Sequence, residues 1–96
     1  MIRNVTMMKF KAGTGARQVA DLTAALAVLR IDGMVSLVSG QDMGLRAAGN
    51  WDYALIADLV DQAAYDRYDS NQEHNRIRRD LAGPILESII RVQFEM

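Results

Sequence analysis

The order in which hydrophobic patterns follow one another is the feature that most restricts the folds open to this chain. Residues 2–11 alternate in the manner of a β-strand, and residues 16–30 then repeat apolar side chains every three or four positions, as a helix does. The remaining patterns predict strands at 34–39, 51–60 and 88–96 and helices at 62–69 and 71–81. This β-α-β-β-α-β order predicts an α+β, ferredoxin-like fold, in which the helices cover one face of a four-stranded antiparallel sheet.

Capping residues mark where the predicted helices begin and end. Thr14 precedes the first helix, where its hydroxyl is expected to accept a hydrogen bond from an unpaired backbone N–H. Asp61 is expected to cap the second helix in the same way, and either Ser70 or Asn71 the third. Proline has no backbone N–H and restricts the residue before it, so we expect the third helix to end ahead of Pro84.

Size and composition narrow the classes of function. A chain of 96 residues without a linker-like segment supports one core, so we expect a single domain over residues 1–96. Eleven basic and twelve acidic residues leave a net charge of −1, which argues against binding to nucleic acid or to an anionic membrane. The absence of cysteine excludes thiol catalysis, and a single histidine argues against a protein-bound metal. Without a membrane-spanning apolar run or a signal-peptide pattern, we expect a cytoplasmic location.

The predicted strands carry more apolar side chains than one covered face of a sheet can bury. In the strand at 51–60, Leu55 and Ile56 are neighbours in sequence and therefore lie on opposite faces. Val5 and Met8 are likewise on opposite faces of the first strand. Because a chain this short has no further element to cover the second face, we expect a second copy to cover it. The result would be a homodimer packed sheet face against sheet face.

Charged residues mark the parts of the chain that are expected to face water. In the last strand, apolar residues alternate with Arg91, Gln93 and Glu95, which predicts a strand with one face in water. The third helix and the end of the second interleave arginines with acidic residues at helical spacing, namely Arg76, Arg78 and Arg79 with Asp69, Glu73 and Asp80. This arrangement favours a solvated surface with ion pairs over an anion site.

His74, the only histidine, is predicted to point toward the sheet. On a helix at 71–81 it shares one face with Ile77 and Leu81, the apolar residues three and seven positions later. A histidine in that position is either a hydrogen-bonded core residue or a general base, because imidazole exchanges protons near neutral pH. Tyr68 lies six residues earlier, where its hydroxyl could approach the same space.

Two strand residues, Asn4 and Tyr53, are expected to face the helices and to meet His74 and Tyr68 there. Four polar groups in an otherwise apolar layer are costly to bury unless each has a hydrogen-bond partner or contacts water. Their convergence therefore predicts a cavity beneath the helices.

Three segments of the sequence together resemble one known family. They are the opening Met1–Lys11, the run Trp51-Asp52-Tyr53-Ala54-Leu55 with Asp58 and Asp61 after it, and Tyr68 followed six residues later by His74. On these residues, and over nearly its whole length, the chain resembles the stress-responsive A/B barrel domain (Dabb) family. The resemblance implies a dimeric α+β barrel built from two ferredoxin-like protomers.

The resemblance also implies an activity. A plant member of the family closes the ring of a linear poly-β-keto thioester by an aldol condensation, with a catalytic tyrosine and histidine that correspond to Tyr68 and His74. It implies that His74 removes an acidic proton from carbon, and that Tyr68 either hydrogen-bonds the oxygen that becomes negative or orients His74. This chemistry needs no metal or organic cofactor.

The resemblance further implies which residues bind the substrate. Asn4 and Tyr53 stand where relatives carry histidines near the start of the chain and in the pocket. Trp51 and Met8 are expected in the apolar wall that holds the substrate in a folded shape. The implied ligand is a hydrophobic small molecule.

Two classes of function stay open on the sequence alone. In the first, the protein is an enzyme that acts on a keto-containing small molecule by acid–base chemistry, most simply polyketide-cyclase-like cyclisation or an isomerisation. In the second, it is a non-catalytic, stress-responsive dimer that binds a small molecule or has a structural role. A heme-handling or monooxygenase-like function is disfavoured, because His74 has no second histidine or cysteine to complete a ligand pair.

Overall fold

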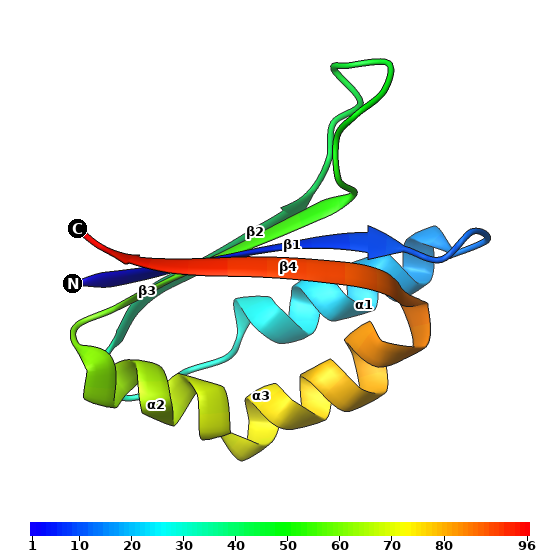
Figure 1. The fold of residues 1–96 in the computed structure, drawn as a ribbon. Helices are drawn as coiled ribbons and strands as arrows, with labels where there is room; N and C mark the ends of the chain where they lie inside the picture. The colour runs from blue at the N-terminus through cyan, green and yellow to red at the C-terminus, as the bar shows by residue number, and fades with distance from the viewer.

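The computed structural model describes all 96 residues, and its elements follow the predicted β-α-β-β-α-β order (Figure 1). The elements are β1 (Ile2–Phe10), α1 (Ala16–Ala27), β2 (Met34–Gln41), β3 (Tyr53–Leu59), α2 (Gln62–Ser70), α3 (Gln72–Ile77), a π-helical turn (Arg78–Ala82), a 3₁₀ turn (Gly83–Ile85) and β4 (Leu86–Glu95). The predicted division into two helices is confirmed, because the chain leaves the helical conformation at Asn71 between α2 and α3.

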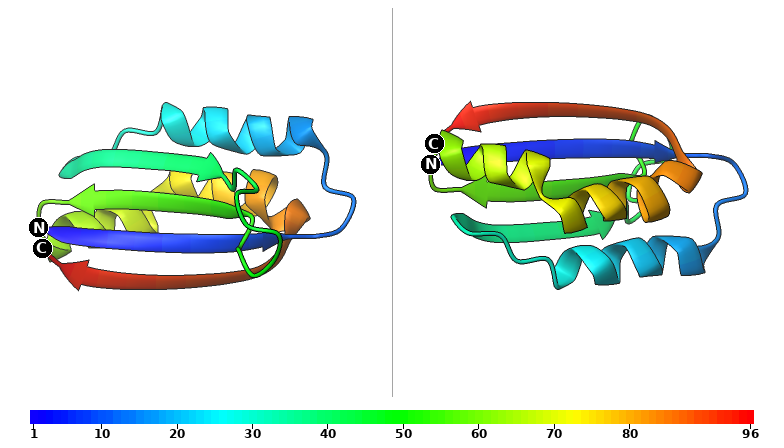
Figure 2. Two further views of the ribbon diagram at one scale, coloured as in Figure 1. Left: turned by 90° about the horizontal axis from the view of Figure 1, so that it is seen from above. Right: turned by 90° about the horizontal axis from the view of Figure 1, so that it is seen from below.

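The four strands form one antiparallel sheet in the order β2-β3-β1-β4. β1 lies in the middle, so that Met8 pairs with Tyr53 of β3 on one side and with Ile89 of β4 on the other. All the helices lie on one face of the sheet, and the other face carries none (Figures 1 and 2). The predicted ferredoxin-like α+β fold is confirmed.

The core lies between the sheet and the helices. Helix α1 buries Val19, Leu22 and Leu26, whose spacings of three and four residues place them on one side of the helix. Opposite them, alternate residues of β3 such as Leu55 are buried, while Ile56 points to the other face. Full burial of one such leucine contributes about 1.5–3 kcal/mol, so these few contacts fix α1 on the sheet.

The start of α1 differs from the prediction. The N-cap residue is Gly15, and the Thr14 hydroxyl instead donates a hydrogen bond to the Lys11 carbonyl at 2.6 Å. Gln18, three residues into the helix, accepts from the Gly15 N–H at 2.9 Å, which is the half of a capping box that does not need a capping side chain. The expectation that Thr14 caps the helix is therefore wrong, because the turn from β1 engages its hydroxyl.

Side-chain caps begin both later helices. Asp61 accepts a hydrogen bond from the Ala64 N–H at 2.9 Å, as predicted for α2. Asn71 does the same for α3, accepting from the His74 N–H at 2.9 Å, which decides between the two residues expected there. The third helical stretch ends at Ala82, ahead of Pro84 as expected, and Pro84 lies in the separate 3₁₀ turn, near whose start a missing N–H costs nothing.

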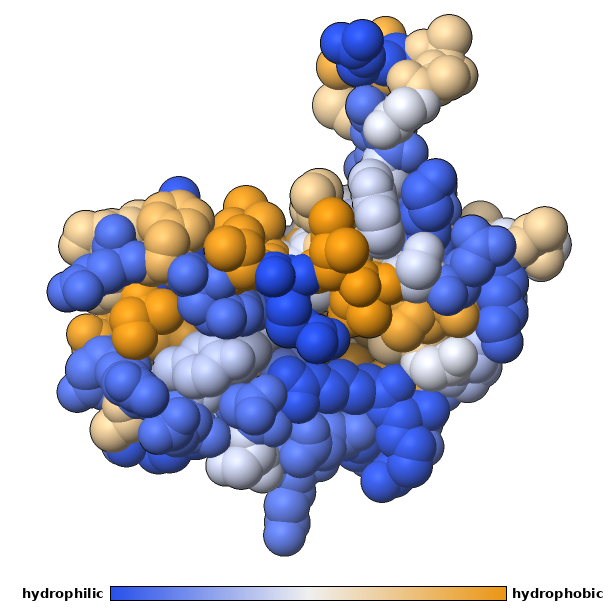
Figure 3. All heavy atoms as spheres, viewed as in Figure 1, coloured by the Kyte–Doolittle hydropathy of each residue, from blue (hydrophilic) through white to orange (hydrophobic).

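The helix-free face of the sheet is apolar. Val38, Ile90, Val92 and Phe94 all lie there with about half of their surface exposed, and Val92 is 55% exposed. In Figure 3, hydrophobic residues gather at the level of the sheet, above the polar helical side of the molecule.

The loop at 42–52 projects from the helix-free side of the sheet (Figure 1). None of the helices has the length and hydrophobicity needed to span a lipid bilayer.

Candidate functional site

A cavity of about 480 Å³ lies between the β1–β4 half of the sheet and the helices. Most of its wall is apolar, and it includes Met8, Leu22, Leu55, Ile77 and Ile89. Its polar wall contains Asn4, Thr6, Tyr68, His74, Arg78 and Arg91. Cavities of this size and composition are typical of small-molecule sites.

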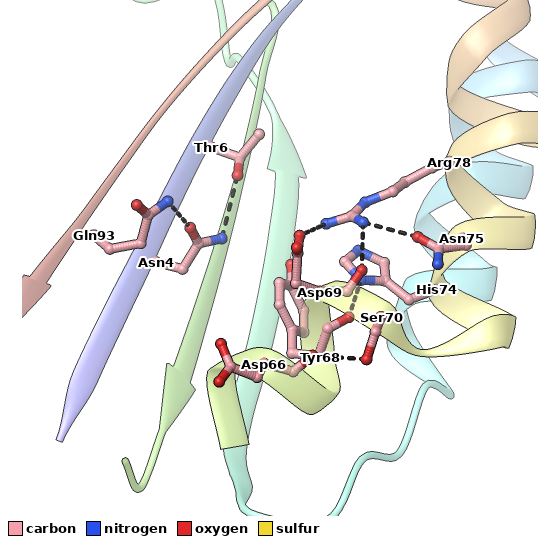
Figure 4. Close-up of polar contacts among 10 residues, drawn as sticks. All are labelled: Asn4, Thr6, Asp66, Tyr68, Asp69, Ser70, His74, Asn75, Arg78 and Gln93. Carbon is pink, nitrogen blue, oxygen red and sulfur yellow. Dashed lines mark hydrogen bonds and ion pairs between the residues drawn. The ribbon is translucent and has the colours of Figure 1, made fainter. Parts of the chain in front are cut away.

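His74 reaches the cavity because of where α3 begins. The Asn71 cap sets the first turn of α3, and the side chain of His74 then faces the sheet with only 2% of its surface exposed. Its Nδ1 atom lies 2.9 Å from the main-chain carbonyl oxygen of Tyr68 (Figure 4). That carbonyl is in the last turn of α2, where carbonyl groups lack partners within the helix.

This contact fixes the tautomer of the imidazole. A carbonyl oxygen only accepts hydrogen bonds, so Nδ1 of His74 must carry the proton and donate it to Tyr68. In the neutral ring the lone pair is therefore on Nε2. Nε2 is the atom able to act as a base.

Nε2 of His74 makes no hydrogen bond within the protein, and the Tyr68 hydroxyl has the side-chain amide of Asn4 beside it, which lowers the pKa of Tyr68. Every side-chain nitrogen or oxygen that is sealed from solvent does have a hydrogen-bond partner. Since both residues line the cavity, both atoms can contact a ligand there.

The surroundings assign opposite protonation roles to the two residues. Burial lowers the pKa of His74, the hydrogen bond to Tyr68 partly opposes this, and the charge of Arg78 lowers it further. Burial raises the pKa of Tyr68, against smaller lowering effects of Arg78, Asn4 and Arg91. At neutral pH the site therefore combines a neutral imidazole that accepts a proton with a phenol that donates a hydrogen bond.

The two rings lie against each other and make no hydrogen bond between them. Their centroids are 4.2 Å apart and the ring planes are tilted by 40°. The sequence left two roles open for Tyr68. The main-chain carbonyl of Tyr68 is the group that orients His74. The hydroxyl stays available for a ligand.

Asn4 is held on the sheet side of the cavity. Gln93 of β4 donates to its Oδ1 at 2.6 Å, and its own amide group donates to Thr6 at 3.4 Å (Figure 4). Because Gln93 occupies the carbonyl oxygen, the side of Asn4 that faces the cavity offers an N–H donor. Met8, two residues beyond Thr6, lines the same cavity.

Tyr53 and Trp51 lie outside this cavity, and the expectation that they line it is wrong. Tyr53 does face the helices, but its hydroxyl bonds Thr23 of α1 at 2.7 Å and Ser39 of β2 at 2.8 Å. Tyr53 is therefore a core residue whose hydroxyl has its hydrogen-bond partners within the protein. It lies in the β2–β3 half of the sheet, away from β4. Trp51 precedes β3 and lines a separate hollow, with the amine of Lys9 5.7 Å from its ring centre.

Arg91 is exposed to solvent, as the sequence pattern predicted, and it also lines the cavity, which the pattern did not predict. From Ile90 onward the last strand alternates as predicted, but Arg91 and Gln93 face the helices, and Val92 and Phe94 face the helix-free side. The register shows this directly, because Arg91 pairs with Thr6, whose side chain is buried beneath the helices.

The arginines of the third helical region do form ion pairs as expected, with Asp69, Glu73 and Asp80. No group of three or more His, Asp or Glu side chains is close enough together to hold a metal ion.

Comparison with known proteins supports the fold and the family. The chain is 26% identical to a dimeric ferredoxin-like protein from Thermobifida fusca, with a TM-score of 0.88 and coverage of 99% of this chain and 90% of that one. A Dabb family protein from Mesorhizobium loti is 20% identical with a TM-score of 0.76, over 99% of this chain and 95% of that one. A hydroxynitrile lyase from Passiflora edulis is 15% identical with a TM-score of 0.82, over 99% and 92%.

No curated protein matches the chain significantly in sequence. The Stress Responsive A/B Barrel Domain family matches residues 2–96, which is nearly the whole chain. Together with the βαββαβ fold and its dimeric structural neighbours, this match shows that the protein belongs to the stress-responsive A/B barrel domain (Dabb) family.

Proposed function

We propose that the protein is a cofactor-independent acid–base enzyme that acts on a keto-containing small molecule bound in the cavity. The observation that carries this proposal is that two complementary groups line one cavity. Nε2 of His74 is an unprotonated base and the Tyr68 hydroxyl is a hydrogen-bond donor.

The reaction that suits these groups is an aldol-type ring closure. Nε2 of His74 takes a proton from a carbon between two carbonyl groups, and the C–H electron pair moves into an enolate. The Tyr68 hydroxyl, with the amide of Asn4 beside it, donates hydrogen bonds to the oxygen that becomes negative. The enolate carbon then bonds to a second carbonyl carbon of the same chain, and the resulting alkoxide takes the proton back from His74.

The main-chain carbonyl of Tyr68 supports both proton transfers. It holds the Nδ1–H of His74, and the same bond stabilises the imidazolium that forms after Nε2 is protonated. The apolar wall around Met8 and Ile89 excludes water and bends the chain of the ligand so that its reacting carbons meet.

The test is turnover of a panel of linear β-diketo and triketo acids, esters and thioesters by the wild-type protein and by His74→Gln. A positioned base contributes about 10²–10⁴-fold, so we expect kcat/KM to fall by at least 100-fold in the variant. Gln72→Ala, on the exposed side of the same helix, is the matched control and should retain full activity. Binding without conversion, or equal rates for wild type and His74→Gln, would contradict catalysis and favour a binding role.

We also propose that the protein works as a homodimer joined through the helix-free faces of the two sheets. Support comes from the apolar side chains on that face and from the dimeric state of structural neighbours. The cytoplasmic location expected from the sequence stays a prediction.

A further inference from the structure

The guanidinium group of Arg91 is the one positive charge at the cavity that no protein group neutralises. The five ion pairs of the structure involve other arginines, and Arg91 makes no side-chain hydrogen bond. Its pairing with Thr6 across the β1–β4 ladder places it on the helix side of the sheet. It therefore lines the cavity and is exposed to solvent, with no protein group bound to its hydrogen-bond donors.

The charges around the cavity sum to one positive charge. Three charged residues line it, Asp69, Arg78 and Arg91. Asp69 accepts from Arg78 at 3.2 Å, so those two charges offset each other. Burial keeps His74 neutral at neutral pH, because it lowers the pKa of the ring. The charge that is left belongs to Arg91.

The cavity is polar at one end and apolar at the other. Asn4 and Thr6 of β1 lie at the end with Arg91, whereas Met8 is at the apolar end with Ile89 beside it. The cavity continues to Leu86, which pairs with Phe10. The four steps from Thr6 to Phe10 span about 13 Å of strand. Tyr68 belongs to the polar end, since the charge of Arg91 acts on its hydroxyl.

We propose that Arg91 binds a carboxylate, and that the ligand of this cavity is an amphiphilic monoanion whose apolar part lies toward Leu86 and Ile89. The planar fork of a guanidinium matches the two oxygens of a carboxylate, and one net positive charge matches one negative charge. The inference rests on the proposed function only in that the cavity must take up a small molecule. It narrows the substrate class from keto compounds in general to keto acids.

The test compares an acid with its uncharged ester by isothermal titration calorimetry. Sodium octanoate and methyl octanoate are the probes, and wild type, Arg91→Gln, Arg91→Lys and Arg46→Gln are the proteins. Arg46 is the matched control, because it is exposed in the projecting loop and lines none of the described cavities. We expect Arg91→Gln to weaken octanoate binding about tenfold and to leave methyl octanoate unchanged. Arg46→Gln should change neither, and Arg91→Lys should recover part of the loss.

Several outcomes would overturn the carboxylate site. They are equal affinity of the wild type for acid and ester, unchanged octanoate binding by Arg91→Gln, or no octanoate binding at all. None of these depends on turnover, so the site is tested even if no substrate is converted. Conversely, turnover of a keto compound that is insensitive to Arg91→Gln would leave the role of His74 standing and reject the acid as substrate class.

Discussion

The Nδ1 atom of His74 and the main-chain carbonyl oxygen of Tyr68 lie 2.9 Å apart, and this single contact decides which ring nitrogen is free. It joins the first turn of α3 to the last turn of α2 across the break at Asn71. The site thus depends on where the chain stops being helical as much as on which side chains it carries.

Stability should depend on pH through His74. Because burial lowers the pKa of this ring below its ordinary value of 6.5, the unfolded chain binds a proton more readily than the folded one. The stabilisation is fully present above pH 6.5 and is lost as pH falls through the lower pKa of the folded protein. Urea denaturation should therefore give a smaller free energy of unfolding at pH 5.5 than at pH 7.5. In His74→Gln this part of the pH dependence should disappear, and an unchanged slope would show that another group causes it.

The Tyr68 hydroxyl should matter for chemistry and not for the state of His74. Tyr68→Phe keeps the aromatic ring and the main-chain carbonyl, so His74 should still carry its proton on Nδ1. Loss of one donor to a developing oxyanion costs about 10²–10³ in kcat. The tautomer is read from the ¹⁵N shifts of the imidazole, and the rate from the keto-compound assay. Tyr53→Phe, a tyrosine outside the cavity whose hydroxyl bonds Thr23 and Ser39, is the control and should keep its rate.

The cap of α3 should affect activity as well as stability. Asn71→Ala removes the side chain that accepts from the His74 N–H, at a cost of about 1 kcal/mol in unfolding free energy. It also loosens the turn that aims the imidazole, so kcat should fall. Asp61→Ala removes the equivalent cap of α2 and should lower stability alone. Equal effects of the two variants on kcat would mean that the cap does not position His74.

The dimer should dissociate when a charge is placed on the helix-free face. Val92 pairs with Val5 there, and Val92→Asp would bury an unpaired carboxylate in the proposed interface. Sedimentation equilibrium at micromolar concentration should show a dimer for the wild type and a monomer for the variant. Val28→Asp, at the exposed end of α1, should stay dimeric. A monomeric wild type would remove the dimer proposal.

The element order and the inward position of His74 follow from sequence periodicity alone. Apolar spacing identifies which face of α3 is buried, and short polar side chains such as Asp61 identify where helices begin. These are local properties, and the packing of the rest of the chain does not change them. Thr14 shows the limit of this reasoning, because a turn competes with a helix for the same hydroxyl.

The site was less predictable because it depends on lateral position within the sheet. Tyr53 points to the expected face, yet β3 places it next to Ser39 and α1, away from the cavity. Arg91 shows a second difficulty. Alternation separates two sets of residues on a strand, but it does not say which set faces the core when the other face is also covered or apolar.

The bond from His74 to the Tyr68 carbonyl has a consequence for how this site can tolerate mutation. Every amino acid supplies the same main-chain oxygen, so no substitution at position 68 removes the group that sets the tautomer. Insertion or deletion of one residue between positions 68 and 74 would instead turn the ring away from that oxygen by about 100° of helix. The protonation pattern of the imidazole is therefore protected against replacement of residues and vulnerable to a change in their number.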